Sequence, residues 1–262
     1  MSAIAACGLL ISTLQTLSNW RLFRAEGLMS WELLKTQPRF ARYGPSPLLE
    51  YLNRFPNFLY LLIVQVLAAL LVLVFPRHDT LRPVSLTLIL TICVLDRLRN
   101  RGHSLVGSDS MNLLIFGALY LREIAPGPLT TQGCLWFIAL QSCLSYATSG
   151  LLKLRVSHWR QGKVLRRIAQ HPVFGNAPLA RLLAGHPRVE RWLGWSIMGY
   201  EMAFPCVLVM GYPGSWIFLG GGLLFHAFIA LAMGLNTFFF AWVATYPAIL
   251  CVTLYPGRTP VA

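Results

Sequence analysis

The chain has 262 residues, of which 56% are hydrophobic and only 12% are charged. Charged residues usually make up about 25% of a soluble domain, so this composition excludes a soluble single-core protein and indicates an integral membrane protein. The net charge of +13 does not indicate nucleic-acid binding, because the basic residues lie between apolar runs and form no stripe interleaved with aromatic residues. Anionic membrane lipids are the expected partners of this charge.

The N-terminal third alternates apolar and basic segments. Residues 1–19 are uncharged and predict a weak first helix, whose crossing of the membrane stays open. Residues 20–56 are basic and aromatic. The spacing of Leu28, Trp31, Leu34 and Lys35 predicts a short amphipathic helix in the membrane interface, broken by Pro38 and Pro45.

Residues 57–75 form the clearest membrane span, with 19 uncharged residues in succession. Gln65 inside this span either bonds a neighbouring helix or is simply tolerated, and we favour tolerance. Two shorter apolar runs follow, at 84–95 and 106–121. The second contains Asp109, which either caps the start of its helix or is a functional carboxylate.

A lysine, Lys153, ends the next apolar run, which carries no charge from Ile124 to Leu152. A helix that begins near Cys134 crosses a bilayer before it reaches this lysine. Ser142, Tyr146, Ser149 and Lys153 then share one helical face. Lys153 either extends its ammonium to the lipid headgroups, or projects into a cavity where desolvation disfavours the charged form and leaves an amine that can act as a base.

The remaining chain begins with a basic connection, 155–191, which predicts two short amphipathic helices resting on the membrane. The next apolar helix, 192–210, carries Glu201 in its middle. A lone buried carboxylate is costly, so we expect Glu201 to be paired, with Lys153 or His226. His226 lies in a helix over 215–233 and is either a satisfied interior histidine or a proton carrier. Phe238 belongs to an aromatic run in the last helix, 237–254, which either packs or walls a flat-ring pocket.

These segments predict one all-α integral membrane domain over residues 1–262. It is a polytopic bundle of about eight transmembrane helices with interfacial amphipathic helices. The six cysteines, at 7, 93, 134, 143, 206 and 251, form no Cys-x-x-Cys motif and no cluster with histidine. They predict buried small side chains, and no metal site is expected.

Several motifs resemble one known family. The segment Ser145–Gly162, SYATSGLLKLRVSHWRQG, contains the ordered residues Tyr146, Gly150, Lys153, Leu154, Trp159 and Gly162. This order resembles the signature segment of the vitamin K-dependent gamma-carboxylase-like family, whose bacterial members are described as HTTM (horizontally transferred transmembrane) proteins. Further matches are Phe225-His226 with Phe238 and Pro247, Glu201 with Pro205, and the short polar motif Arg101, Gly107 and Asp109. The resemblance covers residues 99–247 most strongly.

The resemblance implies a membrane-embedded enzyme, in which Lys153 acts as the base that deprotonates a reduced, vitamin K-like quinone. Glu201, His226, Asp109 and His103 are implied as orienting or proton-relaying residues. Tyr146, Gly150, Trp159 and Phe238 are implied as the wall of a substrate or cofactor pocket. A peptide is the expected substrate, and the inner membrane of a bacterium is the expected location.

Two departures keep a second class of function open. The family segment carries a second lysine at the position of Leu152. The carboxylase also continues into a large extramembrane domain, whereas this sequence stops at Ala262. The alternative is therefore a non-catalytic or accessory membrane protein for the maturation or export of a secreted peptide, working with another subunit.

Overall fold

The computed structural model describes residues 1–36, 46–100, 106–172 and 175–254. All regular secondary structure in these ranges is helical, which confirms the all-α part of the prediction. By its contacts the chain divides into two compact units, one of residues Ser2–Pro126 and one that begins at Gly127 and includes Met1. The predicted single domain stays a prediction. His103, Arg101, Pro38 and Pro45 lie outside the described residues.

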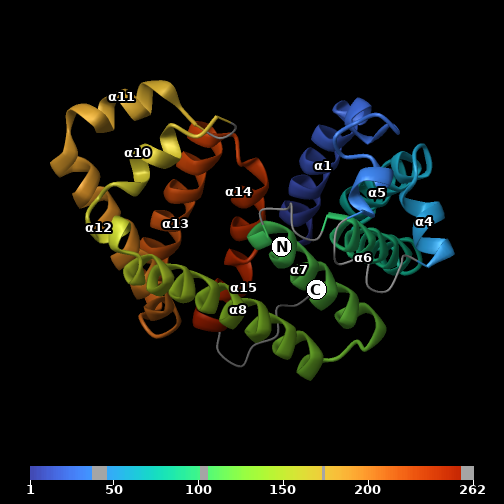
Figure 1. Ribbon diagram of the computed structural model, residues 1–262. Helices are drawn as coiled ribbons and strands as arrows, with labels where there is room; N and C mark the ends of the chain where they lie inside the picture. Colours follow the sequence, from blue (N-terminus) through green and yellow to red (C-terminus); the bar gives the residue numbers. More distant parts are fainter. Residues whose placement is uncertain (37–45, 101–105, 173–174, 255–262) are drawn as a thin grey trace. The chain divides into compact units, whose positions relative to one another are not determined.

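The N-terminal unit is built on four helices that pack in pairs. Its elements are α1 (Ser2–Ser18), η1 (Trp20–Phe23), α2 (Trp31–Leu34), α4 (Pro47–Asn53), α5 (Asn57–Val74), α6 (Leu81–Asn100) and α7 (Val106–Ile124). Helix α1 packs against α5 and α7, and α6 also packs against both α5 and α7 (Figure 1). The residues Ala5, Ala6, Ala68 and Ala69 are fully buried, because small side chains let α1 and α5 approach closely.

Gln65 joins three of these helices. Its Oε1 accepts a hydrogen bond from Thr13 Oγ1 of α1 at 3.2 Å, and its Nε2 donates to Cys93 Sγ of α6 at 3.3 Å. The side chain is buried. The expectation that Gln65 is merely tolerated was therefore wrong, because an amide inside an apolar helix bundle gains free energy by bonding its neighbours.

The polar end of α6 folds inward. The apolar run 84–95 extends at both ends into a helix of 20 residues that includes Arg99. The Arg99 guanidinium is buried, donates to the carbonyl oxygens of Asn53 at 2.7 Å and Met29 at 2.5 Å, and lies 4.2 Å from the Phe58 ring centroid. Arg99 thereby fastens the connecting segment before α5 to the bundle.

The helix predicted around Leu28 and Lys35 is shorter than expected and faces differently. Helix α2 has four residues, and its Trp31 and Leu34 are buried inside the unit, whereas Leu28 is 77% exposed. Ser30 caps α2 by accepting a hydrogen bond from the Leu33 amide at 3.3 Å. The predicted interfacial stripe is therefore divided between the interior and the surface.

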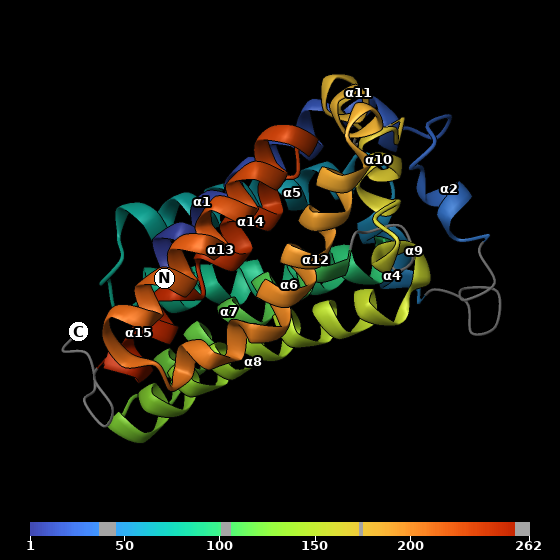
Figure 2. The same cartoon turned by 90° about the vertical axis from the view of Figure 1, so that its left-hand side faces the viewer.

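The C-terminal unit is organised along one long helix. Its elements are α8 (Pro128–Arg155), α9 (Ser157–Arg160), α10 (Val164–Ala169), α11 (Ala177–Gly185), α12 (Pro187–Ala203), η2 (Phe204–Leu208), α13 (Gly211–Met233), α14 (Asn236–Val243) and α15 (Tyr246–Leu254). Helix α8 runs along one side of this unit, and α12 and α15 pack against it (Figure 2). It begins at Pro128, six positions before the predicted Cys134, because Pro is favoured in the first turn of a helix.

Two prolines interrupt helices that the apolar pattern predicts as continuous. The helix predicted over 192–210 ends at Ala203, and Pro205 lies in the 3-10 helix η2 that follows. The helix predicted over 237–254 is broken into α14 and α15 just before Pro247. Proline has no N–H group to continue an α-helix and clashes with the carbonyl four residues before it. As a consequence Glu201 lies in the last turn of α12 rather than at its middle.

The two amphipathic helices predicted in the basic connection exist as α10 and α11. Their apolar residues Ala169, Ala180 and Leu183 are buried together, with Leu165 and Leu179 packed on them. Much of each apolar face is therefore used to hold the two helices together. Leu182, at 59% exposure, remains on the surface.

Four helical stretches are long and apolar enough to cross a membrane. They are Asn57–Val74, Pro128–Arg155, Gly211–Met233 and the α14–α15 stretch Asn236–Leu254. The other helices of the described chain are shorter or more polar, so the predicted eight spans are not confirmed. Four such helices identify a protein whose composition suits a membrane.

Candidate functional site

One face of α8 carries a row of polar side chains into the C-terminal unit. Ser142 and Tyr146 are buried, and Ser149 and Lys153 are partly buried. Ser142 Oγ lies 3.1 Å from Thr245 Oγ1, at the break before α15. The spacing of four, three and four residues therefore places these groups on one inward face, as predicted.

Lys153 forms an ion pair with Glu201 of α12. Its Nζ lies 2.6 Å from both Glu201 carboxylate oxygens and 2.6 Å from Ser149 Oγ. The side chain of Glu201 is 4% exposed and that of Lys153 is 21% exposed. The structure thus joins Glu201 to Lys153, one of its two expected partners, and the pair lies largely out of water.

A second polar pair lies deeper in the same unit. Tyr146 Oη is 2.7 Å from His226 Nε2 and 3.2 Å from Tyr246 Oη. His226 is buried, and its Nδ1 has no hydrogen-bond partner in the described chain. His226 therefore pairs with Tyr146 and not with Glu201, and it keeps one ring nitrogen unused.

Aromatic rings enclose this second pair. The Trp242 ring lies 5.6 Å from the His226 ring at an interplanar angle of 11°, and the Phe204 ring lies 3.8 Å from the Tyr146 ring at 19°. The Tyr200 ring meets Tyr146 edge-on at 6.2 Å. These rings shield the histidine and the tyrosine hydroxyls from water.

Two glycines allow the helices that carry the site to approach. A Cβ on Gly150 would lie 2.8 Å from Met202 Cγ, where α8 meets α12. A Cβ on Gly222 of α13 would lie 2.3 Å from Tyr246 Oη and 2.7 Å from Tyr200 Oη. Gly150 therefore has a packing role that brings Glu201 to Lys153, and Gly222 makes room for the tyrosine hydroxyls.

The other residues predicted to wall a pocket differ in position. Trp159 of α9 is half-buried, and Lys153 Nζ lies 5.4 Å from its ring centroid, within the range of a cation–π contact. Phe238 is half-buried on α14, but the ring that α14 stacks on His226 is that of Trp242.

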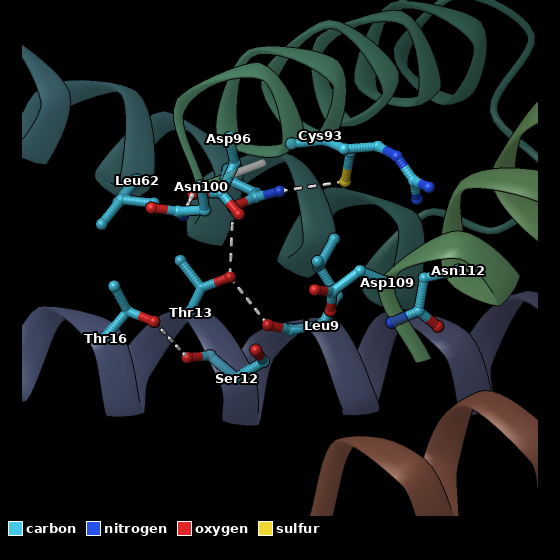
Figure 3. Close-up of a pocket in the computed structure, with 12 residues that line it drawn as sticks. Leu9, Ser12, Thr13, Thr16, Leu62, Cys93, Asp96, Asn100, Asp109 and Asn112 are labelled. Carbon is cyan, nitrogen blue, oxygen red and sulfur yellow. Dashed lines mark hydrogen bonds between the residues drawn. The ribbon is translucent and has the colours of Figure 1, made fainter. Parts of the chain in front are cut away.

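The structure places only one of the two remaining predicted catalytic residues. Asp109 lies in the first turn of α7 in the N-terminal unit, where it lines a small cavity with Asp96 (Figure 3). His103 lies outside the described residues. The predicted catalytic roles of both stay predictions.

Sequence reasoning did not assign Tyr200, Phe204 and Tyr246 to the site. Each is an aromatic residue in an apolar segment, a pattern that is more often ordinary packing. The usable signal was position: Tyr200 and Phe204 flank Glu201 within a turn, and Tyr246 immediately precedes Pro247. Phe204 and Tyr246, the two aromatic residues at the helix breaks, are buried.

No protein-family model, no curated protein and no solved structure matches this chain. The resemblance of Ser145–Gly162 to a carboxylase-like segment therefore stays a prediction. Among the described residues, no group of three or more His, Cys, Asp or Glu side chains is arranged to hold a metal ion.

Proposed function

We propose that this chain is a membrane-embedded enzyme of the vitamin K-dependent carboxylase-like type, in which Lys153 is the base. The expected location is the inner membrane of a bacterium. The observation that supports the proposal is the Lys153–Glu201 pair, at 2.6 Å, with its carboxylate 4% exposed. It stands beside a buried Tyr146–His226 pair in the same unit.

To act as a base, Lys153 must first give up its own proton, and the adjacent Glu201 carboxylate is the acceptor. Removing an ammonium and a carboxylate from water carries a penalty of several kcal/mol per ion, which offsets much of their attraction. Moving the proton from Lys153 to Glu201 gives a neutral amine and a neutral carboxylic acid that keep their mutual hydrogen bond. In that arrangement the lone pair of Lys153 can accept a proton from a substrate.

A reduced quinone, when bound, supplies a flat ring and an acidic hydroxyl group. Its ring would lie against Trp159, a half-buried side chain whose ring centroid is 5.4 Å from Lys153 Nζ. The rings of Tyr146 and His226 do not fit this purpose, because Phe204 and Trp242 already cover them. The residues at the exposed edge of the site would therefore hold the group.

The reaction proposed for the chain's own residues is a single proton transfer. The Lys153 amine takes the proton of the substrate hydroxyl group and becomes an ammonium. That ammonium then stabilises the oxyanion that remains, at a site where low water content strengthens the attraction. Ser149 positions the amine through its 2.6 Å hydrogen bond. His226 Nδ1, buried and without a partner in the described residues, is the group available to relay a proton.

One observation favours the second candidate, an accessory protein without catalysis. An ammonium group has three N–H donors, and Lys153 directs them to Ser149 and to both Glu201 oxygens. In this second candidate, the fully satisfied ion pair has a structural role alone, which is to join α8 to α12. The chain would then assist the maturation or export of a secreted peptide together with another subunit.

Oxygen uptake by the purified protein with a reduced naphthoquinone and a glutamate-containing peptide distinguishes the two candidates. We expect uptake above the rate without protein, and a fall of about 10²-fold or more in Lys153→Ala, since a general base contributes at least this factor. Lys163→Ala is the matched control, because Lys163 is an exposed lysine of the same unit.

Two outcomes would contradict the enzyme proposal. One is full oxygen uptake by folded Lys153→Ala. The other is no uptake by the folded wild-type protein, which would leave the accessory role as the better account.

A further inference from the structure

An open groove lies on the surface of the C-terminal unit, along the first half of α12. It has a volume of about 490 Å³ and is lined by Arg188, Arg191, Trp192 and Trp195. These residues follow the spacing i, i+3, i+4 and i+7, which places them on one face of the helix. All four are exposed. The groove therefore combines positive charge with indole rings on a single helical face.

The described protein does not balance the charge of the two arginines. Neither guanidinium forms an ion pair or a hydrogen bond with a residue of the described chain. Glu190 lies between them in sequence, but it is 2% exposed and its Oε1 accepts a hydrogen bond from the Arg166 backbone N–H at 2.9 Å. Its carboxylate is thus directed to α10. The groove therefore presents two positive charges that a ligand could neutralise.

The groove lies beside one end of a helix that is long and apolar enough to cross a membrane. Helix α8 ends at Arg155, and α9 follows it directly, as Figure 2 shows. Helix α9 packs against α12, and Trp195 Nε1 of the groove donates a hydrogen bond to the Arg160 carbonyl oxygen at 3.2 Å. When α8 spans a bilayer, its charged end lies at the level of the lipid headgroups. The groove then lies at the same level.

Exposed indole rings at this level favour a lipid as the ligand. The apolar residues of α10 and α11 are buried against each other, whereas Trp192 and Trp195 are 75% and 41% exposed. Tryptophan is enriched at the membrane–water interface, because one part of its ring system is apolar and its N–H is polar. An acidic peptide would neutralise the arginines, but it would supply no apolar layer for the indole rings.

We propose that this groove binds one anionic phospholipid. The guanidiniums of Arg188 and Arg191 hold the phosphate through charge-assisted hydrogen bonds. The rings of Trp192 and Trp195 pack against the glycerol and the first part of the acyl chains. The net charge alone predicts a general attraction to anionic lipids over all the basic segments, whereas this site is confined to one face of α12. The proposal is independent of the function of Lys153.

Native mass spectrometry of the purified full chain in detergent tests the site, with phosphatidylglycerol and phosphatidylcholine of identical acyl chains as the probes. The first phosphatidylglycerol should bind about 10-fold more tightly than the first phosphatidylcholine, whose choline cation would lie beside the two guanidiniums. Arg188→Gln/Arg191→Gln should abolish this preference. Arg167→Gln/Arg181→Gln should retain it, because this matched control removes the same charge from two exposed arginines of the same unit outside the groove.

A tryptophan variant separates the contact with the glycerol region from the contact with the headgroup. Trp192→Ala should weaken the binding of both lipids by a similar factor and keep the preference, because the indole contacts the part that the two lipids share. Unchanged affinity for both lipids in Trp192→Ala would contradict the site as described.

Four further results would overturn the proposal. The first is equal affinity of the wild-type chain for the two lipids. The second is a preference that survives in Arg188→Gln/Arg191→Gln. The third is an equal loss of preference in Arg167→Gln/Arg181→Gln, which would show attraction by total charge. The fourth is tighter binding of a glutamate-rich peptide than of phosphatidylglycerol, which would assign the groove to a peptide. The first result needs no variant, so a folding defect in a variant does not protect the proposal.

Discussion

Lys153 and Glu201 depend on each other energetically, whatever reaction they serve. Their charges lie 2.6 Å apart with little water around the carboxylate. Losing one partner of such a pair leaves a partly buried charge without compensation. Replacing both by apolar side chains of similar size removes the charges together and leaves no such penalty.

We expect Glu201→Gln to lower the free energy of unfolding by about 3–5 kcal/mol, because the Lys153 ammonium loses its counter-charge. The double variant Lys153→Met/Glu201→Leu should recover most of that loss. Thermal unfolding in detergent measures both, with Glu26→Gln, an exposed glutamate, as the control. A single variant as stable as the wild type would show that the pair contributes nothing to the fold.

The sequence predicted which residues contribute polar side chains to the site, but it predicted only some of the pairs that these side chains form. The helical spacing of Ser142, Tyr146 and Lys153 correctly predicts one shared face. Glu201 needed a partner, and two were available. Glu201 pairs with Lys153 and not with His226 because the last turn of α12, which carries Glu201, packs against the C-terminal end of α8, which carries Lys153.

At the scale of the helices, close approach at glycine holds the aromatic cluster together. Gly222 of α13 lies against the hydroxyls of Tyr246 and Tyr200, and no side chain fits in that space. Gly220, two residues earlier, has nothing within 4 Å of the position of its Cβ. Packing therefore excludes a larger side chain at position 222 but not at position 220.

Gly222→Ala should destabilise the protein by about 1–3 kcal/mol, because the added methyl group forces the tyrosine hydroxyls apart. Gly220→Ala should instead be neutral or stabilise by up to about 1 kcal/mol, through the higher helix propensity of alanine. Denaturation of the two variants in parallel measures the difference. Equal effects of both substitutions would contradict this account of α13 packing.

Helix boundaries were the least predictable part of the fold. Apolar runs indicate where helices lie, but they do not indicate that α12 stops at Ala203 or that α14 and α15 separate. Pro205 and Pro247 were visible in the sequence. However, a proline often kinks a membrane helix without ending it. Packing of the residues around each proline decides between the two outcomes.

At the scale of the whole molecule, the main consequence of the composition is that the chain suits a membrane. Four helical stretches reach the length and hydropathy that a crossing requires. Many of their large apolar side chains are exposed, including Leu67, Leu144 and Leu224, at 55%, 56% and 73%. Surfaces of this kind are stable in lipid and aggregate in water.

The chain should therefore remain with membranes during extraction with alkaline carbonate and be released only by detergent. Fractionation and immunoblotting of the full-length chain check this, with a peripheral membrane protein as the control that carbonate removes. Release by carbonate alone would show that the four helices do not cross the bilayer.

The sequence by itself determined the helical class, the suitability for a membrane and the polar face of α8. These follow from composition and from periodicity along single segments, which are local properties. Only the tertiary structure decided that Gln65 bonds two other helices, that His226 pairs with Tyr146, and that Asp96 and Asp109 border one cavity. Such pairings depend on which faces of distant segments meet. That choice is set by the packing of many side chains at once, and periodicity within one segment carries no record of it.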